Sequence, residues 1–252
     1  FKEYDKNLVI SQWNEDPMMT GLPDSLTNIN KINKFEKVVD HTFITTDAKI
    51  LRENNVKIKN LHFLFIPVDK NIECFNVYDS DPYNDIFYAM SHGVNRAKLK
   101  KGKIDTRSSF LNNLIKKLNN VSHDFYGLNN KEPIWGESFF QALKNSKMGL
   151  NLSRGNPTKY YSSNRIATLM GNGLLTFIDV KTQFDDIFSK NEIILYNNLN
   201  ELADKIHFYK KNNSLRKKIA KKGQSKYFKL FNETRISKYI VDKSFGKNTS
   251  LF

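Results

Sequence analysis

The chain has 252 residues, enough for one large or two small domains with a hydrophobic core. Hydrophobic residues make up 39% and aromatic residues 13%, which excludes a disordered chain. No apolar run approaches the roughly 18 residues of a membrane span, no signal-peptide pattern opens the chain, and the single cysteine, Cys74, excludes an internal disulfide. We expect a protein of the reducing cytoplasm, and because the first residue is Phe1 we expect further sequence upstream.

The formal net charge of +14 suits a nucleic-acid partner or an anionic membrane face. Lysines are spread along the chain, with modest clusters at 98–103 and 216–222. Lys, Asn and Ile are abundant throughout, as drift in base composition would produce. We therefore interpret the charge as compositional or as a general attraction for anions, rather than as a dedicated nucleic-acid surface.

Strand and helix patterns alternate from the start of the chain. Short apolar runs rich in β-branched residues predict three strands, at 7–13, 41–46 and 60–67. Residues 47–55 predict a helix with Asp47 as its N-cap. Residues 67–84 have little periodicity, so we interpret them as a linker between an incomplete first α/β unit and a complete second one.

The alternation continues in the second unit. Five further strands are predicted, at 85–91, 123–127, 148–153, 173–179 and 192–196. Helices are predicted at 106–120, 136–147 and 162–170, and the tail from Asn198 to about Val241 is helical throughout. Strands that alternate with helices, several of them apolar throughout, predict an α/β fold with parallel sheets covered on both faces.

The loops after the second unit's strands carry the candidate binding residues, because ligands of open parallel sheets bind at the carboxyl ends of the strands. These candidates are Ser91, His92, Gly93, Arg96, Gly127, Arg154, Gly155, Lys159, Asn164 and Arg165. Ser162 or Ser163 is the natural N-cap of the helix that holds Arg165, and free N–H groups beside a guanidinium form an anion site. We predict that this loop holds a diphosphate; the alternative is that these are solvated surface charges.

Two acids, Glu15 and Asp16, follow the first predicted strand. They would lie at a cleft between the two units, where either carboxylate could act as a general base. The alternative is a simple turn at Asp16-Pro17 with solvated acids.

Other well-known motifs do not occur in the sequence. It contains neither G-x-G-x-x-G nor a G-K-S/T phosphate loop, which counts against dinucleotide oxidoreductases and P-loop ATPases. Its five histidines and one cysteine show no metal-ligand spacing, and nothing resembles G-x-S-x-G. We therefore predict no metal site, and we interpret GNG at 171–173 as a helix C-cap and turn.

Several stretches, in order, resemble the carboxyl-terminal half of GT-B glycosyltransferases: DIFYAMSHGVNR, DFYG, ESFFQALKNSKMGLNLSR, NRIATLMGNGLLTF and the tail after EIILY. The CgeB-like (spore-maturation-protein-like) branch of the group 1 enzymes looks closest. The tail is the most specific part, with ELADKI, then LRKKIAKKG, then an aromatic helix containing ETR. The resemblance covers about residues 85–245, and residues 7–73 look like the end of the family's first Rossmann-like domain.

The resemblance implies two Rossmann-like units with parallel sheets facing a cleft. A partial acceptor-side domain would span 1–72, a nucleotide-sugar-binding domain 73–232, and a C-terminal helix at 233–252 would return to the first domain. The donor would bind mainly to the second domain and the acceptor would enter from the first. No metal and no cofactor are implied beyond the nucleotide-sugar co-substrate.

Site residues of the family are matched by position. Arg165 matches the arginine that begins the family's R-x-F-E helix, near the donor diphosphate. The family's glutamate, which often holds the donor ribose, falls on Thr168, so this contact is expected to differ here. Ser91 and Arg96 lie where the family's first loop meets the donor phosphates, and Arg107 competes with Arg96 for that role.

We therefore predict a glycosyltransferase that moves a sugar from a nucleotide-diphosphate donor to an acceptor hydroxyl, in surface polysaccharide or glycolipid synthesis. Its partners would be the donor and a carbohydrate or glycolipid acceptor, without nucleic acid. It would work in the cytoplasm, with peripheral contact at the anionic inner membrane face. The alternatives are a basic nucleic-acid-binding protein and a non-catalytic nucleotide-sugar-binding relative, the latter suggested by Thr168 and the short first domain.

Overall fold

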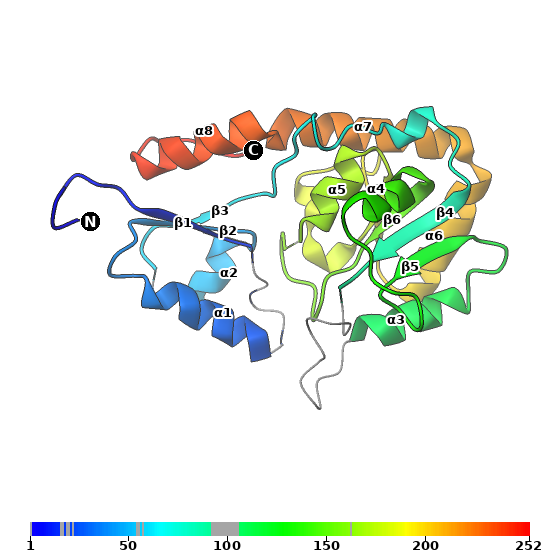
Figure 1. Ribbon diagram of the computed structural model, residues 1–252, viewed down its shortest axis with the longest axis horizontal. Helices are drawn as coiled ribbons and strands as arrows, with labels where there is room; N and C mark the ends of the chain where they lie inside the picture. The colour runs from blue at the N-terminus through cyan, green and yellow to red at the C-terminus, as the bar shows by residue number, and fades with distance from the viewer. Residues whose placement is uncertain are drawn as a thin grey trace.

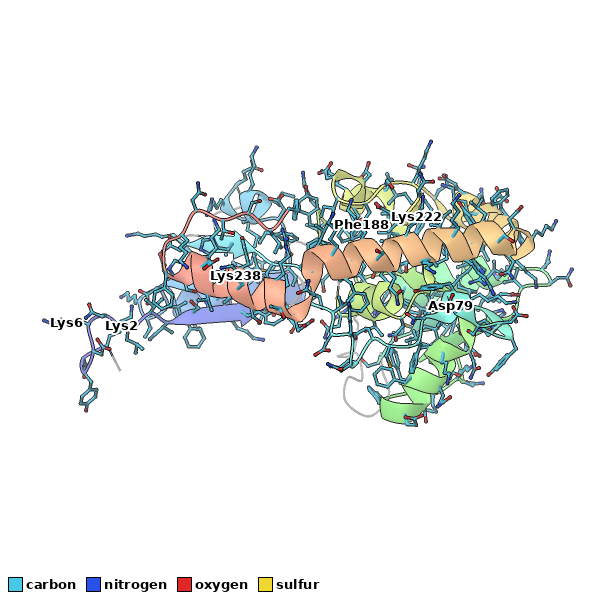
Figure 2. All side chains as sticks on the ribbon, turned by 90° about the horizontal axis from the view of Figure 1, so that it is seen from above. Lys2, Lys6, Asp79, Phe188, Lys222 and Lys238 are labelled. Atoms are coloured by element: carbon cyan, nitrogen blue, oxygen red, sulfur yellow. The ribbon has the colours of Figure 1, made fainter. Side chains whose placement is uncertain are left out.

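The computed structural model describes residues 2–15, 18, 21, 23–53, 56, 58–91, 106–161 and 163–252. Two separate parallel sheets lie side by side, and a pair of helices runs end to end over both (Figures 1 and 2). Every strand pair in the two sheets is parallel, which confirms the predicted α/β class. Within the described ranges, no helix is both long and apolar enough to cross a membrane.

The first sheet has three strands in the order β1-β2-β3, namely Ser11–Asn14, His41–Ile44 and Leu61–Phe63. Successive residues of a strand point to opposite faces. Ile44 accordingly packs in a cluster with Ile32 of α1 (Pro23–Lys34) and Leu51 of α2 (Ala48–Glu53). Phe43 packs on the other face, against Tyr239 of α8 (Glu233–Ser244), with 6.1 Å between ring centroids. The final helix therefore packs on the first unit.

The second sheet has the order β5-β4-β6-β7-β8. Its strands are β4 (Asn84–Ala89), β5 (His123–Tyr126), β6 (Ser146–Asn151), β7 (Leu175–Asp179) and β8 (Ile194–Tyr196). One face packs against α3 (Thr106–Ile115) and α6 (Leu199–Lys211). The other face packs against α4 (Gly136–Lys144) and α5 (Arg165–Gly171), with α7 (Asn213–Phe231) against α5. The carboxyl ends of these strands therefore lie at one edge, as the sequence predicts.

The two units are joined where the segment after β3 meets the end of α7. The N–H of Val68 donates to Phe231 O over 3.0 Å, and the N–H of Glu233 donates back to Val68 O over 3.0 Å. The rings of Phe65 and Phe231 stack with 4.1 Å between centroids. This junction is apolar and hydrogen-bonded at its centre, so it holds α8 in position over the first sheet.

The region 67–84, interpreted from the sequence as a linker, contacts the second unit closely. It contains a short 3₁₀ helix, Val77–Asp79, in which Val77 is fully buried. The hydroxyl of Tyr78 donates to Gln224 Oε1 over 2.6 Å. Gly173 has a positive φ of 77°, and a Cβ there would lie 2.7 Å from the Tyr78 ring. The segment is therefore packed onto α5 and α7, and GNG forms the structural turn that was predicted.

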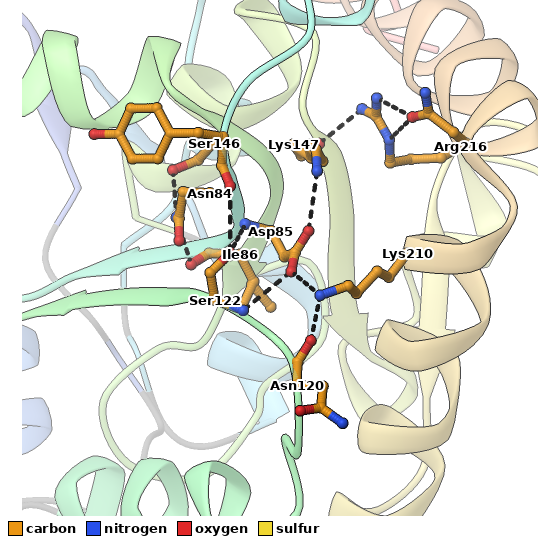
Figure 3. Close-up of polar contacts among 11 residues, drawn as sticks. Asn84, Asp85, Ile86, Asn120, Ser122, Ser146, Lys147, Lys210 and Arg216 are labelled. Atoms are coloured by element: carbon orange, nitrogen blue, oxygen red, sulfur yellow. Dashed lines mark hydrogen bonds and ion pairs between the residues drawn. The ribbon is translucent and has the colours of Figure 1, made fainter.

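A buried ionic cluster closes the opposite, amino-terminal edge of the second sheet (Figure 3). The Asp85 side chain is only 3% exposed and accepts hydrogen bonds from Lys147 over 3.1 Å and Lys210 over 2.6 Å. The backbone N–H of Ser122 donates to the same carboxylate over 3.0 Å. Asp85 therefore connects the starts of β4 and β6 to α6 and to the turn before β5.

Candidate functional site

A cavity of about 630 Å³ lies at the carboxyl-terminal edge of the second sheet. The second unit contributes the end of β4, the starts of α3, α4 and α5, and the residue before α4. The first unit contributes Glu15, which follows β1. The charged and polar residues that line the cavity are Glu15, Ser91, Arg107, Ser163, Asn164, Arg165 and Thr168, and its walls include Phe87, Trp135, Phe139, Tyr161 and Leu169.

Arg165 ties two strand ends together as well as lining the cavity. Its Nη1 donates to Leu152 O over 3.0 Å and to Ser163 Oγ over 3.1 Å, and its Nη2 donates to Ala89 O over 3.3 Å. The guanidinium lies over the Tyr88 ring, 4.8 Å from its centroid. These contacts fix the position of the charge, which matters because a fixed cation needs little reorganisation when an anion binds.

Ser162 or Ser163 was the predicted N-cap of α5. The prediction is wrong for Ser163, and Ser162 lies outside the described residues. Asn164 occupies the N-cap position and makes no side-chain capping hydrogen bond. Ser163 instead accepts from Arg165. The hydroxyl of Thr168 donates to Asn164 O over 3.1 Å, so this residue turns its polar atom back to its own helix. Because α5 has only seven residues, the cations rather than the helix terminus supply the positive charge here.

Arg154 and Lys159 do not line this cavity. Lys159 Nζ lies 3.2 Å from Asp186 Oδ2 and above the Tyr160 ring. Burial opposes the charge of Lys159, but Asp186 and Tyr160 more than offset it and raise the pKa of the ammonium. The carbonyl of Lys159 accepts from the N–H of Asp47, so this loop also contacts the first unit. The Asp47 side chain accepts from the N–H of Lys49, which confirms the predicted α2 cap.

The backbone of Gly127 lies close to another part of the protein, and not beside this cavity. It has φ 76°, and a Cβ there would lie 2.0 Å from Met90 O. A side chain at this position would therefore separate the ends of β4 and β5. Ser91 lines the cavity. The candidates Asp16, His92, Gly93 and Arg96 lie outside the described residues.

Trp135 is a cavity residue that the sequence reasoning missed. Its side chain is 59% exposed although it borders the cavity, where a flat indole is available for stacking. Its signal in the sequence is an isolated tryptophan directly before the Gly136 that begins α4. Arg107, which the resemblance offers only as a rival to Arg96, lines the cavity and donates to the Tyr88 hydroxyl over 3.4 Å.

A second cavity, of about 170 Å³, lies beside the first and shares Arg107 and Tyr161 with it. Asp179 at the end of β7 lines it. Burial raises the pKa of Asp179, although the N–H of Lys181 donates to it and partly opposes that shift. Among the residues that the structure describes, no three His, Cys, Asp or Glu side chains come together as a metal site.

Residues 107–241, more than half of the chain, match the family model described as glycosyl transferase-like. The chain belongs to this family. The matched range contains Arg107, Trp135, Arg165 and Asp179, and therefore most of the second unit's contribution to the two cavities. A search of curated proteins finds no match to the chain.

Solved structures similar to this family member are GT-B glycosyltransferases. HepE from Anabaena, in complex with UDP and glucose, has a TM-score of 0.66 at 11% identity over 94% of this chain and 72% of HepE. Sucrose-phosphate synthase from Thermosynechococcus elongatus has a TM-score of 0.64 at 11% identity, over 95% of this chain and 68% of the synthase. An S. aureus TarM mutant in complex with fondaparinux, α-GlcNAc-glycerol and UDP has a TM-score of 0.64 at 14% identity, over 96% of this chain and 52% of TarM.

The predicted GT-B fold is therefore confirmed. This chain spans about half the length of TarM.

Proposed function

We propose that this protein is a glycosyltransferase that transfers a sugar from a nucleotide-diphosphate donor to an acceptor hydroxyl. The observation that carries the proposal is the 630 Å³ cavity, which falls in the usual size range of roughly 300–1,000 Å³ for small-molecule sites. Two arginines from the second unit and one acid from the first unit line it together. In a chain of the glycosyl transferase-like family, this arrangement suits a donor and an acceptor that meet at one place.

The roles of individual residues follow from their charges and positions. Arg107 and Arg165 would stabilise the leaving diphosphate in place of a metal, because its negative charge grows in the transition state. Trp135 would stack on the base of the donor. Glu15 or Asp16 would take the proton from the acceptor hydroxyl. Arg154 and Lys159 would contribute positive potential beside the cavity rather than direct contacts.

The substrates are proposed by analogy. The Anabaena HepE structure contains UDP and glucose, so UDP-sugars are the first donors to test. We propose a carbohydrate or glycolipid acceptor and a role in surface polysaccharide or glycolipid synthesis, within the CgeB-like branch of the family. We propose no nucleic-acid partner, because the arginines at the site are arranged around a small cavity.

The test is isothermal titration of the full chain with UDP, GDP and ADP, followed by an assay for release of nucleoside diphosphate from the matching sugar conjugates. One diphosphate should bind with a Kd below about 1 mM, and its conjugate should be turned over. If no diphosphate binds at millimolar concentration, the proposal is refuted. Binding without turnover on any acceptor would support the non-catalytic relative, for which the substitution of Thr168 for the family's glutamate is the favouring observation.

We also propose that the protein works in the cytoplasm, in contact with the anionic inner membrane face. Exposed lysines lie on the outer side of the α7–α8 line, among them Lys222 and Lys238 (Figure 2). With a net charge of +14, the protein should sediment with phosphatidylserine vesicles at low salt and much less at 0.5 M salt. Equal sedimentation with neutral phosphatidylcholine vesicles would contradict this contact.

A further inference from the structure

The smaller cavity of about 170 Å³ lies on the α3 side of the carboxyl-terminal edge of the second sheet. The start of α3, the end of β6, the loop towards α5 and the end of β7 enclose it. Arg107 and Tyr161 line both cavities, so a ligand in the larger cavity would meet the smaller one at these two side chains.

The lining of the smaller cavity is polar on several sides, and its two charged side chains, Arg107 and Asp179, have opposite signs. Asp179 brings a carboxylate, Asn151 an amide, and Ser153 and Thr182 bring hydroxyls. Phe110 provides an aromatic wall. A carboxylate accepts hydrogen bonds, an amide both donates and accepts, and a hydroxyl does both. A ring that carries several hydroxyls on its rim and C–H groups on its faces would match this mixture.

Charge and size argue against a phosphate group at this position. Arg107 would attract a phosphate dianion in this cavity, but the carboxylate of Asp179 would repel it. The volume is well below the roughly 300 Å³ at which whole-ligand sites begin, so only one part of a nucleotide sugar would enter. The larger cavity already offers Trp135 to the base and Arg165 to the diphosphate. The ribose joins the base to the diphosphate and would lie between them in the larger cavity. The remaining part of the donor is therefore the sugar.

We propose that the smaller cavity binds the sugar ring of the donor, and that Asp179 and Asn151 select the sugar by hydrogen bonding to its hydroxyls. This inference rests on the proposed function. The donor would extend from Trp135, past Arg107, and into the smaller cavity. Hydroxyls that a sugar presents in the wrong orientation would leave buried polar groups unpaired, which is how such a pocket discriminates.

The test compares nucleoside diphosphate with nucleotide sugar on the full chain. Wild type, Asp179→Asn and Ser153→Leu are titrated with UDP and UDP-glucose, and in parallel with GDP and GDP-mannose and with ADP and ADP-glucose. Asp179→Asn should weaken the nucleotide sugar about tenfold, because a charge-assisted hydrogen bond becomes a neutral one. Ser153→Leu should fill the cavity and abolish the affinity that the sugar adds. Both variants should bind the diphosphate within about twofold of wild type.

Asp185→Asn is the matched control, because it removes the same negative charge as Asp179→Asn. Asp185 is exposed on the 3₁₀ helix Phe184–Asp186 and lines neither cavity. It should bind both ligands as wild type does. Melting temperatures show whether each variant is folded. If Asp179→Asn does not fold, the affinities of Ser153→Leu alone test the sugar assignment. If the cavity variants weaken diphosphate and nucleotide sugar equally, or weaken neither, the sugar assignment is overturned while the proposed function stands. If wild type binds no diphosphate, both fail together.

Discussion

Arg165 lines the larger cavity while it donates hydrogen bonds to the carbonyls of Leu152 and Ala89. Arg165→Ala should therefore lower the melting temperature and also weaken binding of the cognate nucleoside diphosphate, by about one to two orders of magnitude, because a charge-assisted contact is worth roughly 1.5–3 kcal/mol. Arg165→Lys should recover only part of the affinity, since a point charge cannot reproduce the guanidinium fork. Titration calorimetry and thermal unfolding of the same samples measure the two effects.

A matched control for Arg165 is Arg235→Ala on α8. Arg235 also donates to a backbone carbonyl, that of Leu251, over 3.3 Å, but it lies away from both cavities. It should change the melting temperature without changing diphosphate affinity. An Arg165→Ala variant that behaves in the same way would show that Arg165 is structural only.

Asp85 supports a prediction about stability. Asp85→Asn should lower the free energy of unfolding at pH 7 by about 2 kcal/mol, because it leaves Lys147 and Lys210 without their shared anion. We place the cost below that of a fully buried pair, because the two lysine side chains are 22% and 35% exposed and regain water. Urea unfolding measures the difference, with the exposed Asp204→Asn on α6 as a control that should stay within about 0.5 kcal/mol of wild type.

The pH dependence of Asp85 follows from the direction of its pKa shift. Burial alone would raise the pKa, but the hydrogen bonds from Lys210, Ser122 and Lys147 outweigh it and hold the pKa below 3.8. A group whose pKa is lower in the folded state stabilises fully above its unfolded value, and that contribution is lost as pH falls through the folded value. The difference in unfolding free energy between wild type and Asp85→Asn should therefore narrow as the pH falls from about 4 towards 2. A gap that stays constant over this range would be inconsistent with an ionised Asp85.

The sequence predicted the role of a residue well where its partner is a near neighbour in the chain, and poorly where its partner is distant. The Asp47 cap was predictable because its partner, Lys49, is two positions away. The contacts of Arg165 were not, because its acceptors at Leu152 and Ala89 are backbone carbonyls that carry no side-chain signal. Whether Trp135 would reach the cavity depends on the path of the loop before α4, which periodicity does not describe.

At the scale of elements, apolar runs located the strands to within a few residues, since a strand buried on both faces needs such a run. Helix α1 was missed because, of its apolar side chains, Ile29 and Ile32 are buried while Leu26 is 67% exposed. An apolar stripe of two residues gives little helical periodicity in the sequence. The helical pattern of the tail predicted most of α8, whereas its place on the first unit was implied only by the resemblance, because that packing depends on the distant pair Tyr239 and Phe43.

Tyr239→Ala tests how far α8 stabilises the first unit. Removing a buried aromatic side chain should cost about 3 kcal/mol, and the loss should be local, because the ring contacts Phe43 of β2. Hydrogen exchange should speed up in β1–β3 and stay unchanged in β4–β8. Val241→Ala, on the exposed side of the same helix, should leave both sheets protected. Equal loss of protection in both sheets would mean that the two units unfold as one.

At the scale of the whole molecule, the two units contribute different groups to one cavity. The second unit brings both arginines, and the first brings Glu15. The sequence could place Glu15 at the end of a strand. Its presence in the same cavity as Arg165 depends on how the two units are joined, through the long-range contacts at Val68 and along α8. The division implies that donor binding and proton removal can be changed separately.

Glu15→Gln and Asp16→Asn test that division. If either acid takes the acceptor proton, its amide variant should lower turnover by about 10²–10⁴-fold, the usual contribution of general-base catalysis. Donor affinity should change less than about threefold, because the donor is held by the second unit. Glu53→Gln, at the end of α2 in the same unit and away from the cavity, should leave both quantities unchanged. Steady-state kinetics gives the turnover and calorimetry the donor affinity of each variant. If the variant that loses turnover loses donor affinity by the same factor, the acid holds the donor, and the base must be sought elsewhere in the cleft.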